Sequence, residues 1–151
     1  MTAEVGAPAP GFTLRDQYNQ PVSLADFAGH RNVLLVFFPA AFTGVCAGEL
    51  RAIQEQLDHL QNDEAQVLGV SVDSPYANRV WAEREGFTFP LLSDFWPHGA
   101  VAQRYGCFDA ERGKATRGSY LVDRAGVLRW QVVHDVDARD VGDYLAALAE
   151  V

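Results

Sequence analysis

Blocks of hydrophobic and polar residues along this chain predict a mixed α/β protein. Two apolar runs, 32–38 and 65–72, are bounded by polar residues and have the length of buried β-strands. Each is followed by a stretch with apolar residues at helical spacing, which predicts helices over about 43–61 and 74–85. The order strand–helix–strand–helix is typical of a sheet with parallel central strands and helices packed against it.

The remaining blocks are shorter and are separated by proline and glycine. They predict, in chain order, a hairpin (12–15 and 22–24), a helical turn near 25–27, a short strand within 87–93, a short helix at 97–105, a second hairpin (119–122 and 127–133) and a last helix that begins at Asp137 or Asp140. We therefore expect an α/β fold with a mixed central sheet, helices on both faces and an N-terminal β-hairpin. At 151 residues, we expect a single domain spanning 1–151.

Composition and charge argue against several classes of partner. The chain is 48% hydrophobic and carries a net charge of −8, with scattered rather than clustered cations. This balance disfavours nucleic acids and anionic membranes as partners, because both need a basic face. No apolar run reaches the ~20 residues that span a bilayer, and the N-terminal residues have no secretory-signal pattern. We expect a cytoplasmic protein.

The two cysteines, Cys46 and Cys107, are too few for a disulfide framework. The four histidines form no pair at metal-ligand spacing, so we expect no metal site. Each thiol is therefore either functional or a packed side chain, since free cysteines are commonly buried.

Cys46 has the more informative setting, because it lies just beyond strand 32–38 in the first turn of a helix. Backbone N–H groups and the helix dipole stabilise a thiolate there. Thr43 lies one turn before it, where its hydroxyl can approach the sulfur or cap the helix. Pro39 has no N–H and a fixed φ, so it would shield the thiol and rigidify the loop.

A thiolate also needs a cationic partner. The nearest basic residue in sequence is Arg51, whose direction the pattern leaves open. Arg117 opens a different buried strand and could reach Cys46 through the fold. Glu49, one turn after Cys46, is either a solvated helix residue or a partner that orients a cation.

These residues carry a family resemblance. Pro39-x-x-x-Thr43-x-x-Cys46 resembles the peroxiredoxin active-site motif, and Arg117 in Arg-Gly-Ser-Tyr-Leu-Val-Asp resembles the distal arginine of that family. Further segments follow in the family's order: 6–14, 24–29, 87–94 and 105–106. Segments 38–46 and 93–101 are most similar to the one-cysteine alkyl hydroperoxide reductase E group.

The resemblance implies a thioredoxin-like fold and a thiol peroxidase that contributes to cell redox homeostasis. Cys46 would reduce hydrogen peroxide, organic hydroperoxides or peroxynitrite and become a sulfenic acid, while Thr43 and Arg117 hold the peroxide oxygens. Pro39 would shield the thiol and Glu49 would orient Arg117. It implies no metal or organic cofactor. The reductant would be a low-molecular-weight thiol or a thioredoxin- or glutaredoxin-like protein, and the assembly a homodimer.

Three alternatives stay open. Cys107 is either a resolving thiol, as in atypical two-cysteine peroxidases, or a packed side chain. Oxidation of Cys46 could instead signal to a protein partner, as in a redox relay. Some aromatic residues could line a peroxide pocket or a dimer contact, although core packing is commoner at such spacing: Trp81, Phe87, Phe89 and Trp96. A disulfide reductase is disfavoured, because Cys46 begins no C-x-x-C pair.

Overall fold

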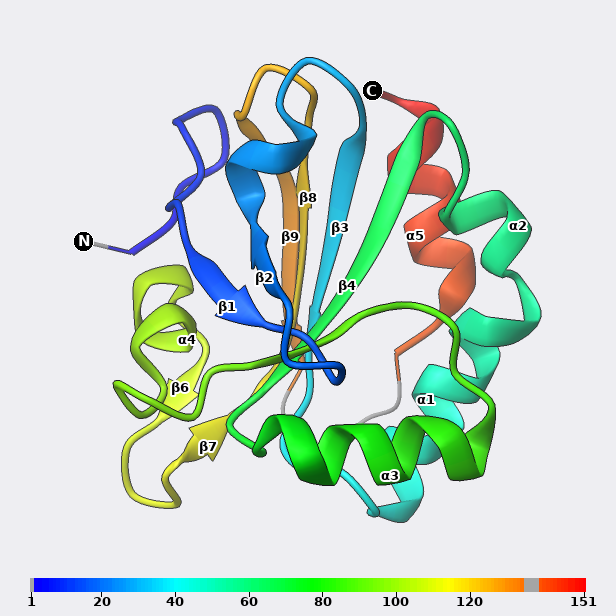
Figure 1. The fold of residues 1–151 in the computed structure, drawn as a ribbon. Helices are drawn as coiled ribbons and strands as arrows, with labels where there is room; N and C mark the ends of the chain where they lie inside the picture. Colours follow the sequence, from blue (N-terminus) through cyan, green and yellow to red (C-terminus); the bar gives the residue numbers. More distant parts are fainter. Residues whose placement is uncertain (1, 135–138) are drawn as a thin grey trace.

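A seven-stranded mixed sheet forms the centre of the molecule in the computed structural model, which describes residues 2–134 and 139–151 (Figure 1). The strand order is β2-β1-β5-β4-β3-β8-β9. These strands are β1 (Thr13–Arg15), β2 (Pro21–Ser23), β3 (Asn32–Phe37), β4 (Ala65–Ser71), β5 (Leu91–Ser93), β8 (Arg117–Val122) and β9 (Leu128–His134). A separate two-stranded hairpin joins β6 (Phe108–Asp109) to β7 (Lys114–Ala115).

The two predicted apolar runs form neighbouring central strands. Strand β3 pairs in parallel with β4 and antiparallel with β8, and β4 pairs in parallel with β5. Every residue of β3 and β4 is buried, which explains why both read as continuous apolar runs rather than alternating ones. The expectation of a mixed sheet is confirmed.

Helices cover both faces of the sheet, as expected. They are η1 (Leu24–Phe27), α1 (Gly44–Glu55), α2 (Leu57–Leu60), α3 (Pro75–Glu85), α4 (Ala100–Tyr105) and α5 (Val141–Ala149). One buried cluster lies beneath α4 and the N-terminal segment, and the other beneath α1, α2 and α5 (Figure 1). Alternate residues of β3 point into the two clusters, Leu35 into the first and Leu34 into the second.

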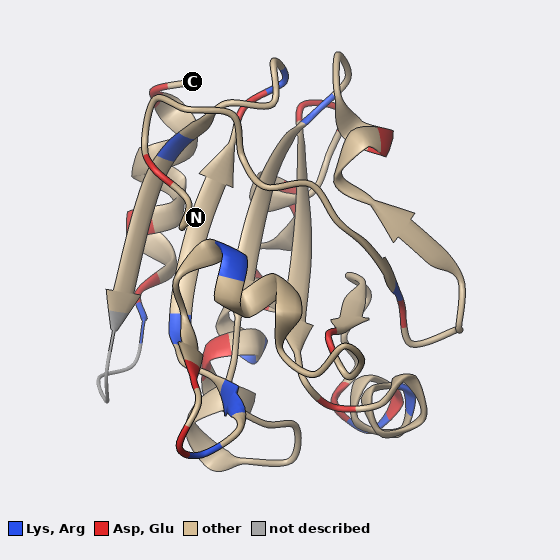
Figure 2. Ribbon diagram, turned by 90° about the vertical axis from the view of Figure 1, so that its left-hand side faces the viewer, with Lys and Arg blue, Asp and Glu red and all other residues tan. Residues whose placement is uncertain are grey.

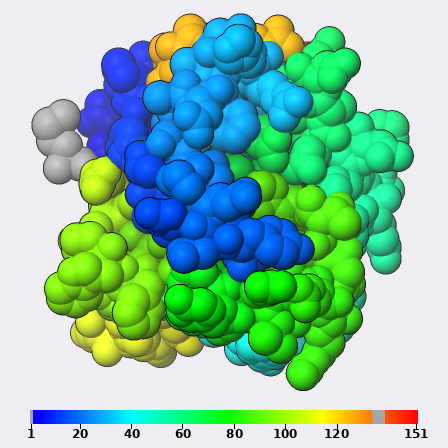
Figure 3. Space-filling model, viewed as in Figure 1, coloured from blue at the N-terminus to red at the C-terminus, as the bar shows by residue number. Residues whose placement is uncertain are grey.

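The N-terminal hairpin β1–β2 extends the sheet beyond β5 and lies against the chain around α3 (Figure 3). Its connection is tied down by Gln17, whose side chain donates to the Phe89 carbonyl at 3.1 Å and accepts from the Leu91 N–H at 2.8 Å. The predicted hairpin is thus present, and its turn is fixed to the core.

Helix α3 follows the predicted signals closely. Its N-cap Ser74 accepts from the Ala77 N–H, Pro75 is the first helical residue, and Gly86 ends the helix in the left-handed region with φ 80°. The predicted helix over 43–61 is interrupted at Gln56, where φ −109° and ψ 19° separate α1 from α2. That prediction was too long.

Two other helix starts can be compared with the prediction. One differs from it, and the other decides between two predicted residues. Helix α4 begins at Ala100 rather than 97, because Gly99 takes φ 70° and the Asp94 carboxylate accepts from backbone N–H groups of the first turn. Asp140 caps α5 by accepting from the Gly142 N–H at 2.8 Å, whereas Asp137 lies outside the described residues. The β6–β7 hairpin was not predicted, since each of its strands has only two residues.

The candidate aromatic residues divide between core and surface. Three are buried beneath α1 and α3, as core packing predicts: Trp81, Phe87 and Phe89. Trp96 is 80% exposed, so it belongs to no core. In the part of the chain that the structure describes, no helix has the length and apolar character to cross a bilayer.

Candidate functional site

Cys46 lies at the floor of a cleft of about 420 Å³. It belongs to the first turn of α1, directly after β3 and a short loop, and its side chain is 1% exposed. The cleft is lined by Pro39, Ala40, Thr43, Gly44, Val45, Cys46, Asp109, Arg112, Lys114, Ala115, Thr116 and Arg117. Residues from two separate parts of the chain, 39–46 and 109–117, therefore meet around this sulfur, and they include Pro39, Thr43 and Arg117.

The loop that precedes Cys46 is fixed by an aspartate at the end of the neighbouring strand. The Ala41 N–H donates to Asp73 Oδ2 at 2.8 Å, and the Ser71 hydroxyl donates to the same oxygen at 2.7 Å. Phe42 takes φ 66°, an unusual value for a bulky residue, and its ring lies 6.2 Å from that of Trp81. The surrounding contacts thus hold a strained backbone beside the thiol.

Thr43 is the N-cap residue of α1, but its side chain makes no capping bond. Its hydroxyl donates to the Ala40 carbonyl at 2.7 Å instead, so the capping bond that the sequence allowed is not formed. Because the hydroxyl proton goes to that carbonyl, the lone pairs of Oγ1 stay available as acceptors within the cleft.

A buried arginine approaches the thiol from the sheet. Arg117, 8% exposed, is the first residue of β8, and its Nη1 donates to Cys46 Sγ at 3.7 Å. Arg51, the nearest basic residue in sequence, pairs instead with Glu85 at 2.5 Å on the surface. The cation beside the sulfur therefore comes from a distant strand rather than from a sequence neighbour.

Glu49 holds Arg117 through a buried ion pair of 3.4 Å, so it is not a solvated helix residue. Its carboxylate also accepts from Arg139: from the backbone N–H at 2.7 Å, from Nε at 2.9 Å and from Nη2 at 3.3 Å. Nη1 of Arg139 donates to the Phe37 carbonyl at 2.6 Å and the Gly118 carbonyl at 3.1 Å. Glu49 and Arg139 together thus link α1, the end of β3, the start of β8 and the chain before α5.

Arg139 is a site residue that sequence reasoning missed. It stands between strand β9 and helix α5, a position where an arginine is usually solvated. The only signal was its place two residues before the amphipathic helix, which does not reveal burial. Its 7% exposure follows from the long-range contact with Glu49.

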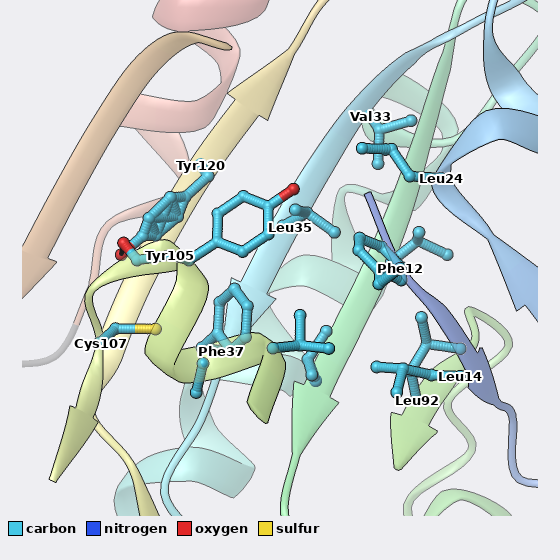
Figure 4. Packing of buried hydrophobic residues seen from close by; sticks show 14 of the residues in the cluster. Phe12, Leu14, Leu24, Val33, Leu35, Phe37, Leu92, Tyr105, Cys107 and Tyr120 are labelled. Carbon is cyan, nitrogen blue, oxygen red and sulfur yellow. Dashed lines mark hydrogen bonds between the residues drawn. The ribbon is translucent and has the colours of Figure 1, made fainter. Parts of the chain in front are cut away.

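Cys107 belongs to the other face of the sheet. It is buried in the cluster beneath α4, beside Tyr105, Tyr120 and Phe37 (Figure 4). Cys46 belongs to the cluster on the opposite face. Burial raises the pKa of the Cys107 thiol to about 12. A thiol with that pKa is almost wholly protonated near pH 7 and is therefore a poor nucleophile.

The site combines a buried sulfur nucleophile, an adjacent guanidinium and free helix N–H groups. Such an arrangement can attack an electrophile and stabilise negative charge on the group that leaves. Among residues 2–134 and 139–151, no three His, Cys, Asp or Glu side chains lie together as a metal site would require.

Comparisons of the sequence and of the fold with known proteins give matches over most of the chain. The sequence model of the AhpC/TSA family matches residues 5–131. The chain is 51% identical to alkyl hydroperoxide reductase E of Mycobacterium tuberculosis, over 96% of this chain and 95% of the relative, and 35% identical to peroxiredoxin-2 of Rattus norvegicus, over 89% and 71%. Its fold is similar to the crystal structure of Enterococcus faecalis AhpC, with a TM-score of 0.88 and 29% identity over 99% of this chain and 92% of that one.

Proposed function

This chain is a thiol peroxidase of the AhpC/TSA family, that is, a peroxiredoxin, and we propose that Cys46 is its peroxide-reducing residue. One observation carries the assignment to Cys46. Its sulfur lies at the floor of the cleft, in the first turn of α1, with Nη1 of Arg117 at 3.7 Å. Hydrogen peroxide, organic hydroperoxides and peroxynitrite are the proposed substrates.

In the proposed reaction, the Cys46 thiolate attacks the terminal peroxide oxygen. A sulfur–oxygen bond forms and the O–O bond breaks. An alkoxide leaves from an organic hydroperoxide and is protonated to an alcohol, hydroxide leaves from hydrogen peroxide and is protonated to water, and nitrite leaves from peroxynitrite. Cys46 is left as a sulfenic acid, oxidised by two electrons, while the peroxide is reduced by two.

The cleft provides groups for both peroxide oxygens. Arg117 Nη1 and the Cys46 backbone N–H would donate to the oxygens as charge moves from sulfur to the leaving group. Thr43 Oγ1, whose own proton points to the Ala40 carbonyl, would accept a hydrogen bond from the O–H of the attacked hydroperoxide. Pro39 forms part of the cleft wall and would limit access of water to the thiol.

Glu49 and Arg139 act as positioning residues for Arg117 in this account. Neither lines the cleft, yet Glu49 holds Arg117 at 3.4 Å and Arg139 holds both oxygens of Glu49. Their role is to keep the guanidinium beside the sulfur before a peroxide arrives.

We propose that an external thiol, rather than Cys107, reduces the sulfenic acid. Cys107 is 1% exposed and lies in the cluster on the face of the sheet away from Cys46. A disulfide needs Cα atoms within about 7 Å, so pairing these cysteines would require the sheet to be disrupted. The reductant would be a small thiol or a thioredoxin- or glutaredoxin-like protein, in a reducing cytoplasm.

A homodimer is the proposed assembly. Large apolar side chains gather on the outer surface of α3 and the neighbouring loop: Tyr76 is 74% exposed, Val80 50% and Phe42 49%. Tyr76 and Val80 are one helical turn apart, and Phe42 packs against Trp81 of the same helix. Sedimentation velocity should give twice the chain mass, and Val80→Glu should shift the protein toward monomer.

Peroxide consumption with added dithiol tests the activity. The wild-type protein and Cys107→Ser should both turn over hydrogen peroxide, whereas Cys46→Ser should not. Undiminished turnover by Cys46→Ser would refute the assignment of Cys46. A protein that becomes oxidised once but does not turn over would instead favour the redox-relay interpretation.

A further inference from the structure

The rim of the Cys46 cleft has the opposite charge to the molecule as a whole. The chain carries a net charge of −8, and acidic residues are spread over its helices and loops (Figure 2). Yet the cleft is lined by three cationic residues, Arg112, Lys114 and Arg117, and by one acidic residue, Asp109. A local excess of positive charge around the cleft that leads to a buried sulfur favours the approach of anions.

The β6–β7 hairpin presents two of these cations. Asp109 and Lys114 face each other across the hairpin, and residues 110–113 form its turn. Asp109 accepts from the Glu111 N–H at 3.1 Å, the Arg112 N–H at 3.2 Å and Arg112 Nη1 at 3.1 Å. These hydrogen bonds hold the pKa of Asp109 below its ordinary value, so its charge is already matched by the turn and by Arg112.

Lys114 is left without such compensation. Among residues 2–134 and 139–151, no carboxylate lies within ion-pair distance of its ammonium group, and Glu111 on the same turn does not line the cleft. It is also the only lysine of the sequence. The rim therefore has an ammonium group that is available to an incoming anion.

Oxidation of Cys46 increases this positive excess. The reactive form of Cys46 is the thiolate, which carries one negative charge beside Arg117, whereas a sulfenic acid is neutral. The cleft that holds the sulfenic acid is therefore more positive by one unit than the cleft that holds the thiolate. An anion is attracted most strongly at the stage when a reductant must enter.

We propose that this cationic rim, with Lys114 as its central residue, selects a small thiol bearing a carboxylate as the reductant of oxidised Cys46. The inference rests on the proposed function. The reductant's thiolate attacks the Cys46 sulfur, an S–S bond forms, and the S–O bond breaks to release hydroxide, which is protonated to water. A second thiolate then attacks the reductant's sulfur, which releases a symmetric disulfide and the Cys46 thiolate.

The positive charge of the rim attracts the reductant more strongly than the peroxide, because the two differ in charge at the reacting atom. The species that enters to reduce the sulfenic acid is a thiolate, which is anionic at the reacting atom, and a carboxylate adds a second charge. A hydroperoxide is neutral at the reacting atom, and the thiolate is already present when it enters. The rim thus accelerates the second half-reaction.

Three thiols of similar size and different charge test this proposal: 3-mercaptopropionate, 2-mercaptoethanol and cysteamine. The protein is oxidised with one equivalent of hydrogen peroxide, and its reduction is followed by stopped-flow tryptophan fluorescence, with rate constants corrected for the thiolate fraction. We expect 3-mercaptopropionate to react about tenfold faster than 2-mercaptoethanol at low ionic strength, and cysteamine to react slowest. Salt should reduce these differences.

Lys114 variants identify the source of the effect. Lys114→Gln should remove most of the advantage of 3-mercaptopropionate, and Lys114→Glu should reverse the order of the three thiols. Arg129→Gln, which makes the same charge change in an exposed pair with Asp123, should behave as wild type. Acetylation should mimic Lys114→Gln, while reductive methylation, which keeps the positive charge, should not.

Two results would overturn the inference. Rates that do not depend on thiol charge would show that the rim does not select the reductant. If Lys114→Glu instead slowed oxidation by linoleate hydroperoxide but not by its methyl ester, with thiol rates unchanged, the rim would select an anionic peroxide. Failure of Cys46 to gain oxygen from hydrogen peroxide would refute the proposed function itself, which separates the two claims.

Discussion

Glu49 forms ion pairs with two buried arginines, Arg117 and Arg139. The substitution Glu49→Gln therefore tests whether this carboxylate keeps Arg117 beside Cys46. The carboxylate lies 3.4 Å from Nη1 of Arg117 and 2.9 Å from Nε of Arg139, and its side chain is 2% exposed. Glutamine has nearly the same shape but no charge. It also presents N–H donors to guanidinium groups that can only donate, so residue 49 would offer the two buried cations a single acceptor oxygen in place of a charged carboxylate.

The expected loss of stability is large for a single substitution. At about 3 Å and an effective dielectric constant of ~20, the attraction within each pair is about 5 kcal/mol before desolvation is counted. Desolvation offsets much of this, and removing one partner of a buried pair costs about 3–5 kcal/mol in practice. Because folded domains are stable by about 5–15 kcal/mol, Glu49→Gln should unfold at much lower urea concentration.

The same substitution should slow oxidation of Cys46. Arg117 would no longer be held beside the sulfur, and a displacement of about 1 Å lowers rates by roughly 100-fold. Urea titration measures the free energy of unfolding, and stopped-flow fluorescence measures the oxidation rate of the protein that remains folded.

Glu85→Gln is the matched control, because it breaks the exposed pair with Arg51. It should change neither the oxidation rate nor, to any marked degree, the stability. If Glu49→Gln behaved like this control in both measurements, the idea that Glu49 positions Arg117 would be wrong.

Three further substitutions or treatments test other parts of the account. Thr43→Val, which removes the hydroxyl from the cleft, should slow Cys46 oxidation by about 10²-fold. Thr43→Ser, which keeps the hydroxyl, should retain most of the rate. Equal oxidation rates for the two variants would exclude a role of the hydroxyl. Asp94→Ala should lower the free energy of unfolding by about 1.5–3 kcal/mol, because two backbone N–H groups of α4 lose a charged acceptor. A urea midpoint equal to that of the wild-type protein would contradict the prediction. In a Cys46→Ser background, native Cys107 should resist iodoacetamide at pH 8 and react readily in guanidinium, as read by mass spectrometry. The pKa of Cys107 is raised to about 12 in the folded protein, so its protonated thiol contributes free energy of unfolding. This contribution is complete below the ordinary thiol pKa of ~8.5 and is lost as the pH rises toward 12. Cys107→Ala should reduce that loss of stability at high pH.

Local signals in the sequence were enough to predict most of the fold. The apolar runs that became β3 and β4 and the Ser-Pro start and glycine end of α3 depend on interactions within a few residues. The same is true of Cys46 in the first turn of α1. These features need only strand burial and capping preferences, which the chain displays directly.

The residues whose contacts the sequence did not reveal, or left open, depend on loop geometry, strand order and distant parts of the chain. Arg139 is buried because Glu49 lies 90 residues away in sequence and 2.9 Å away in space. Thr43 has the sequence signature of an N-cap, but the loop brings the Ala40 carbonyl to its hydroxyl. The placement of Cys107 on the opposite face from Cys46 follows from strand order, which no local pattern specifies.

The central claim is that Cys46 alone takes oxygen from the peroxide and leaves Cys107 unchanged. Intact-mass measurement after one equivalent of hydrogen peroxide tests it directly. We predict that the wild-type protein and Cys107→Ser each gain one oxygen atom on Cys46, and that Cys46→Ser gains none. A loss of two hydrogens in the wild-type protein, indicating a disulfide with Cys107, or an oxygen gained by Cys46→Ser, would contradict the account.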